Sequence, residues 1–511
     1  MRLRRILGTV KSNMTTVDHI VAGSGIAGLC VARLLNMAGR SVRLVEKAPR
    51  IGGSLRRFRR KGLPFDTGFH FTGALGENGI LRDMLRILGM RDAVRPLFPD
   101  PDQAHRFVFE SLGKEIDVPC GLPRIRARLK DVFQGESRAI DGYFDRMEHV
   151  CRGTSAMSLD ALSLSPRPVD EDYVTLQETL DELTDNALLK AVLSGFCMCY
   201  GTAPAQVSFA NHARICLAMY EGVARVEHGG NAFIDAFSDL FKAGSVDIST
   251  GTWVEDCLDI ENDRAGLFRL NTGEEIAASS CVLTMHPFEI LRTLPRDRIS
   301  KAFIDRIEAF EPSCGFFSVF GETDASENDS PTDQIVSLFP DIDLNALLDP
   351  TRTDDSALVI LNSAEPVGTR TRLAVTGLEI ASQASVAPWR NTRTGHRPPE
   401  YQAYKTERAE RMLARMKAYS GVYGDRFRLL DNASPLTFRD WLHSPDGSAY
   451  GVRQKMGQYN LFGKLPVRNM YAAGQSAVLP GLVGAMVSAF MICRAVLGKD
   501  AFARLLHQGR Q

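Results

Sequence analysis

The chain has 511 residues, and its 61 Lys and Arg residues balance its 61 Asp and Glu residues, so its formal net charge is zero. A neutral chain has no overall field that would favour nucleic acid or an acidic partner. The ten cysteines are scattered, and the CxC pair Cys197 and Cys199 fits no common zinc or redox motif. We therefore expect reduced thiols, a cytoplasmic location and no metal site.

The first 14 residues form a basic tail that includes Arg2, Arg4 and Arg5. The tail lacks the apolar core of a signal peptide, and the chain has no apolar run of about 18 residues that could span a bilayer. Two interpretations of the tail stay open. It is a frayed terminus, or it makes a peripheral contact with the cytoplasmic face of a membrane.

A dinucleotide-binding turn follows the first predicted strand, residues 18–22. The turn has the spacing GxGxxG and runs directly into a helix. In such a turn the first glycine permits the tight bend, the second lets the backbone approach a pyrophosphate, and the third lets the helix pack closely on the strand. The predicted binding residues here are Gly23, Gly25, Ile26, Ala27 and Gly28.

A second predicted strand, residues 41–45, ends in an acidic residue about 20 positions after the last glycine, where a carboxylate can accept the ribose hydroxyls. A second glycine pair follows the acid. This order resembles that of the two-dinucleotide-binding flavoproteins, in which the chain runs back along FAD. The predicted binding residues of this segment are Glu46, Lys47, Gly52, Gly53 and Ser54.

The middle of the chain alternates between helical and strand patterns. A charged helix over 401–419 is expected to have a solvated face, because acidic and basic residues are interspersed along it. Helices are also predicted over 179–193 and 209–220 and from 228 onward, and strands over 245–248, 251–254, 267–270, 275–276, 280–284, 316–320, 357–361 and 373–377.

Near the C-terminus a predicted strand, residues 469–473, ends in Gly474, and the final helix opens over 480–485. Gly474, Gly484 and Ala485 are predicted to border the cofactor, with the two glycines presenting backbone amides to a phosphate or to the flavin carbonyl edge. A cofactor motif at each end of the chain indicates FAD as the cofactor.

Because the cofactor motifs are so far apart, the FAD-binding domain must be discontinuous. We predict an α/β protein with a Rossmann-like FAD-binding domain of the two-dinucleotide-binding flavoprotein type and an interleaved α+β substrate domain. The first comprises residues 15–95, 225–300 and 436–511, and the second comprises 96–224 and 301–435.

The two glycine motifs, the segment 65–70 and the closing run 480–485 resemble the phytoene desaturase superfamily. Within it the chain is most similar to the branch of all-trans-retinol 13,14-reductases and carotenoid isomerases, because 200–213, 434–438 and 447–451 resemble blocks of that branch. The resemblance implies redox chemistry at a conjugated apolar chain, a tunnel for the substrate and a backbone contact from Val254 to the adenine.

Few residues are candidates for acid–base chemistry. His70 follows a glycine in a segment predicted to lie near the flavin, while His212 and Glu221 fall on or beside an apolar helix. An apolar helix also accommodates a histidine as a satisfied core residue. Because the chain has no second GxGxxG, NAD(P)H would bind only transiently as an electron donor.

Three functions stay open. The first is an FAD-dependent saturase that reduces a carbon–carbon double bond of a retinoid-like or carotenoid-like polyene, favoured by Gln475 and the run 481–485. The second is a desaturase or cis–trans isomerase of such polyenes. The third is a non-catalytic flavin-bound lipid-handling protein, disfavoured by the complete FAD signature. The identity of the polyene, the bond addressed and the oligomeric state are not predicted.

Overall fold

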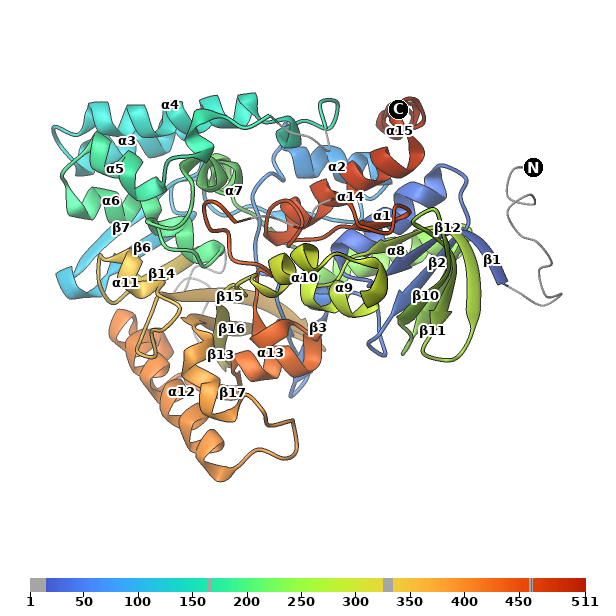
Figure 1. Ribbon diagram of the computed structural model, residues 1–511. Helices are drawn as coiled ribbons and strands as arrows, with labels where there is room; N and C mark the ends of the chain where they lie inside the picture. The colour runs from blue at the N-terminus through green and yellow to red at the C-terminus, as the bar shows by residue number, and fades with distance from the viewer. Residues whose placement is uncertain (1–14, 163–166, 325–333, 459–460, 462) are drawn as a thin grey trace.

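The computed structural model describes residues 15–162, 167–324, 334–458, 461 and 463–511. The predicted basic tail lies outside the described residues. Two β-sheets dominate the described part, and the chain alternates between them (Figure 1). No helix of the described residues is both long enough and apolar enough to cross a membrane.

The first sheet has eight strands in the order β10-β11-β12-β1-β2-β9, and β19 pairs with both β12 and β18. β1 pairs in parallel with β12 and β2, which suits a strand buried on both faces. Ile20 and Val21 of β1 are fully buried. The strands are β1 (Thr15–Ala22), β2 (Val42–Glu46), β9 (Val246–Thr250), β10 (Val254–Glu261), β11 (Arg264–Leu270), β12 (Glu275–Leu283), β18 (Gly463–Lys464) and β19 (Met470–Ala472).

Helices from both ends of the chain cover this sheet. The first and the penultimate helices, α1 and α14, pack against each other, and Figure 1 shows blue α1 beside red α14. Leu35 of α1 and Phe490 of α14 are fully buried in one cluster. The helices of this part are α1 (Ile26–Met37), α2 (Ile80–Leu88), α8 (Gly230–Lys242), α9 (Pro287–Thr293), α10 (Lys301–Glu308), α14 (Gly481–Leu497) and α15 (Lys499–Arg510).

The second sheet has seven strands in the order β17-β13-β16-β15-β14-β6-β7. Its pairs are antiparallel except for β6 with β14. The strands are β6 (His105–Phe109), β7 (Lys114–Val118), β13 (Gly315–Thr323), β14 (Ile335–Phe339), β15 (Leu358–Val367), β16 (Arg370–Ala381) and β17 (Phe427–Ala433). The remaining strands form two small two-stranded sheets, β3 (Arg57–Arg60) with β4 (Leu63–Asp66), and β5 (Pro96–Leu97) with β8 (Arg225–Val226).

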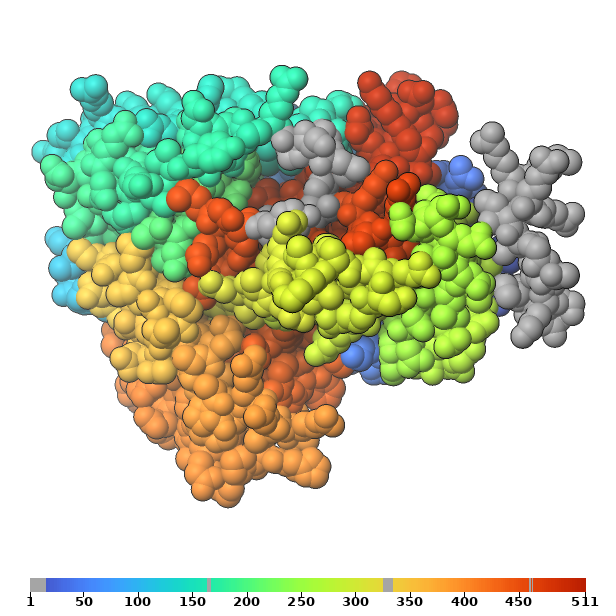
Figure 2. Space-filling view, in the orientation of Figure 1, coloured from blue at the N-terminus to red at the C-terminus, as the bar shows by residue number. Residues whose placement is uncertain are grey.

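A helical layer packs on the second sheet. The ring of Phe107 on β6 lies 5.4 Å from that of Phe196, joining strand and layer in one core. Figure 2 shows this layer (cyan to green) above α9 and α10 (yellow-green), with α12 (orange) along the lower edge. The helices here are α3 (Leu122–Val132), α4 (Ser137–Gly153), α5 (Leu176–Leu183), α6 (Ala187–Ser194), α7 (Phe209–Glu221), α11 (Leu344–Leu347), α12 (Pro399–Tyr419) and α13 (Pro435–Leu442).

Four predicted elements differ from the structure. The helix predicted over 179–193 is two helices, because Thr184 adopts an extended conformation and Asn186 caps a new helix through its side chain. The strand predicted over 251–254 is a turn, with β10 beginning only at Val254. The strands predicted over 275–276 and 280–284 are a single strand, β12, because buried small residues continue the pattern between them.

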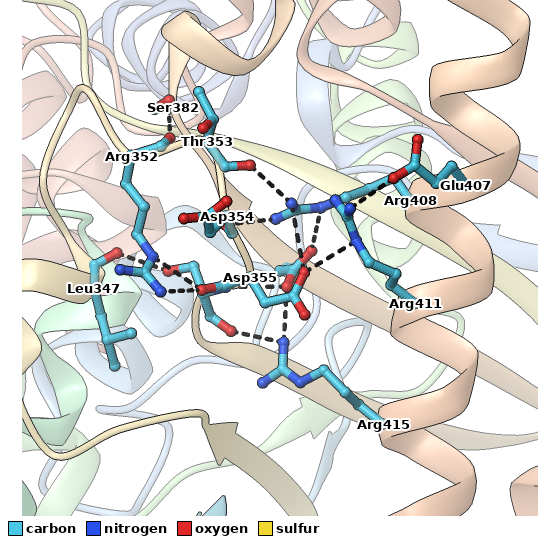
Figure 3. A network of polar contacts seen from close by, with 12 residues as sticks. Leu347, Arg352, Thr353, Asp354, Asp355, Ser382, Glu407, Arg408, Arg411 and Arg415 are labelled. Carbon is cyan, nitrogen blue, oxygen red and sulfur yellow. Dashed lines mark hydrogen bonds and ion pairs between the residues drawn. The ribbon is translucent and has the colours of Figure 1, made fainter. Parts of the chain in front are cut away.

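The prediction of a solvated face for α12 was only partly right. Arg408 is buried, and its Nε donates to Glu379 on β16 over 2.7 Å. Figure 3 shows arginines of α12 converging on Asp355 and its neighbours, which ties the loop between α11 and β15 to the helix. Burial raises the pKa of Glu379, although the guanidinium groups of Arg408 and Arg415 oppose this shift.

The strands of each sheet can be compared with the predicted domain boundaries. The strands of the first sheet fall within 15–95, 225–300 and 436–511, and those of the second fall within 96–224 and 301–435. α13 is different, since it lies almost wholly in the segment assigned to the FAD-binding domain but packs on β13 and β17 of the second sheet.

Candidate flavin and substrate site

A cavity of about 700 Å³ runs between the two sheets. The turn after β1, the end of β2, the start of β10 and the start of α14 line one part of it, and residues 67–73 and 474–476 line the middle. The third part lies against α7 and the second sheet. The cavity therefore joins a nucleotide-binding region to a region formed by the predicted substrate domain.

The GxGxxG turn has the geometry that its spacing predicts. Gly23 has φ +97°, a conformation that favours glycine. A Cβ added at Gly28 would overlap the carbonyl oxygen of Gly23, so the close packing of α1 on the turn excludes a side chain there. The hydroxyl of Thr284, at the end of β12, donates to the Ala22 carbonyl over 2.9 Å and braces the turn from the neighbouring strand.

Gly25 differs from the other two glycines. Its φ is −64°, and a Cβ built on it would meet no protein atom within 4 Å. Neither backbone conformation nor protein packing therefore requires glycine at this position. The residue lines the cavity at the N-terminus of α1, together with Ile26 and Ala27, where free backbone N–H groups favour an anion. The open volume at Gly25 fits the pyrophosphate of a dinucleotide.

Glu46 lines the cavity and holds the same turn. Its Oε2 accepts hydrogen bonds from the backbone N–H of Ser24 over 2.8 Å and from the Ser24 hydroxyl over 2.5 Å. Its Oε1 accepts from the backbone N–H of Ala48 over 2.7 Å. Since each carboxylate oxygen can accept two hydrogen bonds, Oε1 retains capacity for one ribose hydroxyl.

The second glycine pair lies against the first motif. Gly52 and Gly53 both have positive φ, and the Gly52 N–H donates to the Ser24 carbonyl. A Cβ on Gly53 would lie 3.1 Å from the Cα of Gly25. Gly53 and Ser54 line the cavity, whereas Gly52 supports them from behind.

Aromatic and imidazole groups complete the nucleotide-binding part. The Lys47 ammonium lies 5.7 Å from the ring centre of Trp253, next to Val254, and all three residues line the cavity. His286 caps α9 through Nδ1, which accepts the Phe288 N–H, so the proton of a neutral ring lies on Nε2. That Nε2 faces the backbone carbonyl of Gly451, which opposes the lowering of the His286 pKa by burial to about 4.

The closing motif lines the cavity at Gly474, Gly484 and Ala485, but the two glycine amides do not take the predicted role. Gly474 lines the cavity, but its N–H donates to the hydroxyl of Ser488 over 2.8 Å and is not available to a cofactor. Gly484 is required by packing, because a Cβ there would overlap the Leu479 carbonyl. The free amides of α14 are those of its first turn, which begins at Gly481, one turn before Ala485.

His70 lines the middle of the cavity. Burial and the guanidinium groups of Arg225 and Arg57 lower the pKa of His70 to about 3. Arg57 is held nearby by Asp66 and Glu365, with its Nε 2.9 Å from Asp66 Oδ1. At neutral pH the His70 imidazole is therefore neutral and can donate or accept a hydrogen bond, but it cannot act as an imidazolium acid.

The structure does not bring the other two predicted catalytic residues to the cavity. His212 is fully buried between Tyr143 and Tyr200, and it is not among the lining residues. Glu221 ends α7 and is exposed, again outside the lining. Neither position supports the prediction that these side chains take part in catalysis.

The substrate part of the cavity is almost wholly apolar. Its charged lining residue is Arg214, on the same face of α7 as Ile215. The motifs in the sequence do not point to Ser24, Thr284, Ser488 or Arg214 as site residues, because Ser24 fills a variable position of the GxGxxG turn and the other three lie outside the cofactor motifs. The remaining side chains of this part come from helices and from the face of the second sheet: Met157, Met198, Cys199, Ala218, Met219, Phe316, Val359, Leu378 and Tyr450.

Comparison with known proteins identifies the family. The model of the family described as flavin containing amine oxidoreductase matches residues 26–320. The chain belongs to this family. This oxidoreductase is 23% identical to the all-trans-retinol 13,14-reductase of Danio rerio over 95% of its own length and 86% of that protein's. It is 28% identical to the hydroxyneurosporene desaturase of Rubrivivax gelatinosus over 52% of each chain.

The fold agrees with the family. An oxidoreductase structure from Methanosarcina mazei superposes with a TM-score of 0.65 at 16% identity, covering 92% of this chain and 98% of that one. The protein is an FAD-dependent oxidoreductase, as the motifs at its two ends predict. Glu46 and the turn at Gly25 would hold the adenosine and pyrophosphate, with the segments at His70 and Gly474 beside the flavin.

Proposed function

We propose that this protein reduces a carbon–carbon double bond of an apolar conjugated polyene of retinoid or carotenoid type. The observation that carries the proposal is the chemistry of the substrate part of the cavity, whose walls are apolar apart from Arg214. Long apolar ligands bind in such spaces because each buried CH₂ group contributes about 0.8 kcal/mol. The likeness to retinol 13,14-reductases along nearly the whole chain supports the same function.

The same walls argue against an amine substrate, although the family is described by amine oxidation. A protonated amine loses its hydration in an apolar cavity, and the rings of Phe316 and Tyr450 would offset only part of the loss that a carboxylate would offset. The carboxylates that line the cavity are Glu46, Glu255 and Glu289, and they belong to the nucleotide-binding part. The carboxylate of Asp172 is already paired with Arg214 and does not line the cavity, so it is not available to an amine.

FAD, once reduced by a two-electron donor such as NAD(P)H, would supply the hydride to one carbon of the double bond, and the other carbon would take a proton that originates from the solvent. The residues of this chain bind the polyene between α7 and the second sheet, orient it along the cavity and exclude water from the reacting bond. His70, neutral and beside the flavin segment, serves as a hydrogen-bonding group and not as the acid that delivers a proton.

An anaerobic mixing experiment tests the proposal. Holoenzyme is reduced with dithionite, freed of excess reductant and mixed with all-trans-retinol under nitrogen. We expect the oxidised flavin band to return as the polyene absorbance falls, with one dihydro product per flavin. Flavin that stays reduced beside unchanged polyene would contradict the proposal, as would reduction of oxidised flavin by putrescine.

The alternatives predict other outcomes of the same mixture. A desaturase would reduce oxidised flavin and lengthen the conjugated system, while an isomerase would change the polyene with no net change in the flavin. NADH and NADPH, tested as reductants with and without polyene, would identify a nicotinamide as the natural donor. A protein that binds FAD but shows none of these reactions would be a lipid-handling protein.

We also propose a peripheral membrane contact, because polyenes of this class partition into lipid. An apolar opening beside the cavity and the basic tail would make the contact. Tyr173, which follows Asp172 near Arg214, is 71% exposed and supplies apolar surface at this position.

A further inference from the structure

Arg214 joins the substrate part of the cavity to a set of acceptors behind it. Its Nη1 lies 2.5 Å and its Nη2 3.0 Å from the two carboxylate oxygens of Asp172, and its Nε donates to the hydroxyl of Thr154 over 3.0 Å. Nη1 also donates to Asn211. Arg214 lines the cavity, whereas these three partners do not. The guanidinium is therefore fixed by partners behind the wall, and the Arg214 side chain belongs to the wall itself.

Nearly all the N–H groups of the Arg214 guanidinium have hydrogen-bond acceptors. A guanidinium has five N–H groups, of which four are used by Asp172, Thr154 and Asn211. Among the described residues, Nη2 has a single acceptor, so one N–H remains. That donor belongs to a side chain only 11% exposed to solvent. A buried donor of this kind favours an acceptor on a ligand.

The partner Asp172 decides which acceptor suits the site. Its carboxylate neutralises the guanidinium through two parallel hydrogen bonds and is itself fixed by the backbone N–H of Val169. A ligand carboxylate would lose its hydration and meet a pair that carries no net charge, which makes its burial costly. A hydroxyl or carbonyl oxygen would lose far less hydration and still accept the free N–H.

The face of α7 gives the ligand a direction. Ile215, Ala218 and Met219 continue the cavity wall from Arg214 along the helix. Toward solvent, Asp172 is partly exposed and Tyr173 more so. A polyene that places its oxygen at Arg214 would therefore lay its apolar chain along α7 toward the flavin segment.

We infer that Arg214, positioned by Asp172, selects polyenes that end in a neutral oxygen, such as an alcohol or aldehyde, over hydrocarbon and carboxylate analogues. This inference rests on the proposed function and deepens it. Arg214 is a binding residue here, and Asp172 is a positioning residue that also sets the charge of the site.

The test compares three ligands with one polyene skeleton: all-trans-retinol, all-trans-retinoic acid and the hydrocarbon lacking the oxygen. Dissociation constants are measured on oxidised holoenzyme from the perturbation of the flavin spectrum. For the wild type we expect retinol to bind about tenfold more tightly than the hydrocarbon, the ratio that one hydrogen bond provides. Retinoic acid should bind more weakly than retinol.

Two variants separate the roles of the pair. The double variant Arg214→Met with Asp172→Asn removes both charges together, so no buried charge is left unpaired, and it should bind retinol and the hydrocarbon equally. Asp172→Asn alone keeps the guanidinium without its counter-ion and should bind retinoic acid at least about tenfold more tightly than the wild type does. The FAD content should be unchanged in both, because neither residue belongs to the nucleotide-binding part.

Each outcome bears on a defined claim. If the double variant keeps the wild-type ratio of retinol to hydrocarbon affinity, or Asp172→Asn leaves retinoic acid binding unchanged, the inference about Arg214 is wrong and the proposed function stands. If wild-type holoenzyme binds none of the three ligands, the proposed function fails and takes this inference with it.

Discussion

The Nε2 of His212 lies 2.7 Å from the hydroxyl oxygen of Tyr143, and both side chains are fully buried. The Tyr143 hydroxyl donates its proton to the Leu193 carbonyl, so His212 must be the donor in the bond between them. Its Nδ1 is then unprotonated and accepts from the Tyr200 hydroxyl over 2.9 Å. The imidazole is a neutral bridge between α7 and its neighbours, with no atom left for substrate chemistry.

Replacing this bridge should destabilise the fold and spare the cofactor. His212→Phe removes both hydrogen bonds and leaves buried tyrosine hydroxyls with fewer partners, which costs about 2–4 kcal/mol in the free energy of unfolding. Urea unfolding followed by circular dichroism at pH 7 measures this loss. FAD content and polyene reduction per folded molecule should be unchanged, so a well-folded variant that fails to reduce polyene would restore the catalytic interpretation.

The same histidine makes stability depend on pH. Burial lowers the pKa of His212 to about 3, while in the unfolded chain it stays near 6.5. Between these values the unfolded state binds a proton that the folded state does not, so the stability is full above pH 6.5 and falls as the pH drops toward 3. Because the variant lacks this group, its deficit relative to the wild type should shrink by about 2 kcal/mol between pH 7 and pH 5.

The open volume at Gly25 predicts a cofactor-specific effect of a small side chain. Gly25→Ala should leave the apoprotein stable to within about 1 kcal/mol, because the backbone is ordinary and no protein atom lies near the new methyl group. FAD should be lost on gel filtration, since the methyl group occupies the pyrophosphate position. Gly76→Ala is the matched control, at an open position outside the cavity lining. Retention of stoichiometric flavin by Gly25→Ala would contradict the assignment.

Replacing Glu46 should lower the affinity for FAD by more than the loss of one hydrogen bond to the ribose, because Glu46 also holds the turn. Three donors converge on its carboxylate from Ser24 and Ala48, so Glu46→Gln would place an amide NH₂ group against at least one of them. We expect the affinity for FAD to fall about 10- to 100-fold in titrations of apoprotein. Glu255→Gln is the control, because Glu255 also lines the cavity but is exposed. Equal effects of the two substitutions would show that only the charge of the region matters.

The parts of the site that could be predicted are those in which the backbone geometry requires one type of residue at a fixed position. Gly23 and Gly28 are required by a turn and by close packing, and both requirements appear in the sequence as fixed spacings. Gly474 is different, because its role as an amide donor was inferred from spacing alone. The hydroxyl of Ser488, 14 residues further along the chain in α14, accepts the hydrogen bond from the Gly474 N–H. No pattern in the sequence links the two residues.

Ion pairs between residues that are far apart in the sequence leave no recognisable pattern around either residue. Arg408 lies in a helix whose mixed charges are typical of a solvated face, yet Glu379 on β16 draws it into the interior. Arg214 is likewise held in place by an ion pair with Asp172, which lies on another element of the predicted substrate domain. Such pairs depend on the tertiary arrangement, which composition and periodicity do not encode.

The last prediction concerns the membrane. If the basic tail contributes to a peripheral contact, the protein should pellet partly with vesicles containing phosphatidylserine and be released by salt, because screening shortens the reach of Arg2, Arg4 and Arg5. Neutral phosphatidylcholine vesicles should retain less of it. Deleting Met1–Asn13 should lower the binding without changing the flavin spectrum, since β1 begins only at Thr15.

A second variant tests the other half of the same contact. Tyr173→Ser removes exposed apolar surface beside the cavity and should weaken binding to both kinds of vesicle, because burial of apolar area does not depend on lipid charge. Equal binding by the truncated and full-length proteins would reject the tail as an anchor and leave the apolar surface as the sole contact. Failure of every form to bind either kind of vesicle would reject peripheral attachment, and the enzyme would have to receive its apolar substrate from a soluble carrier.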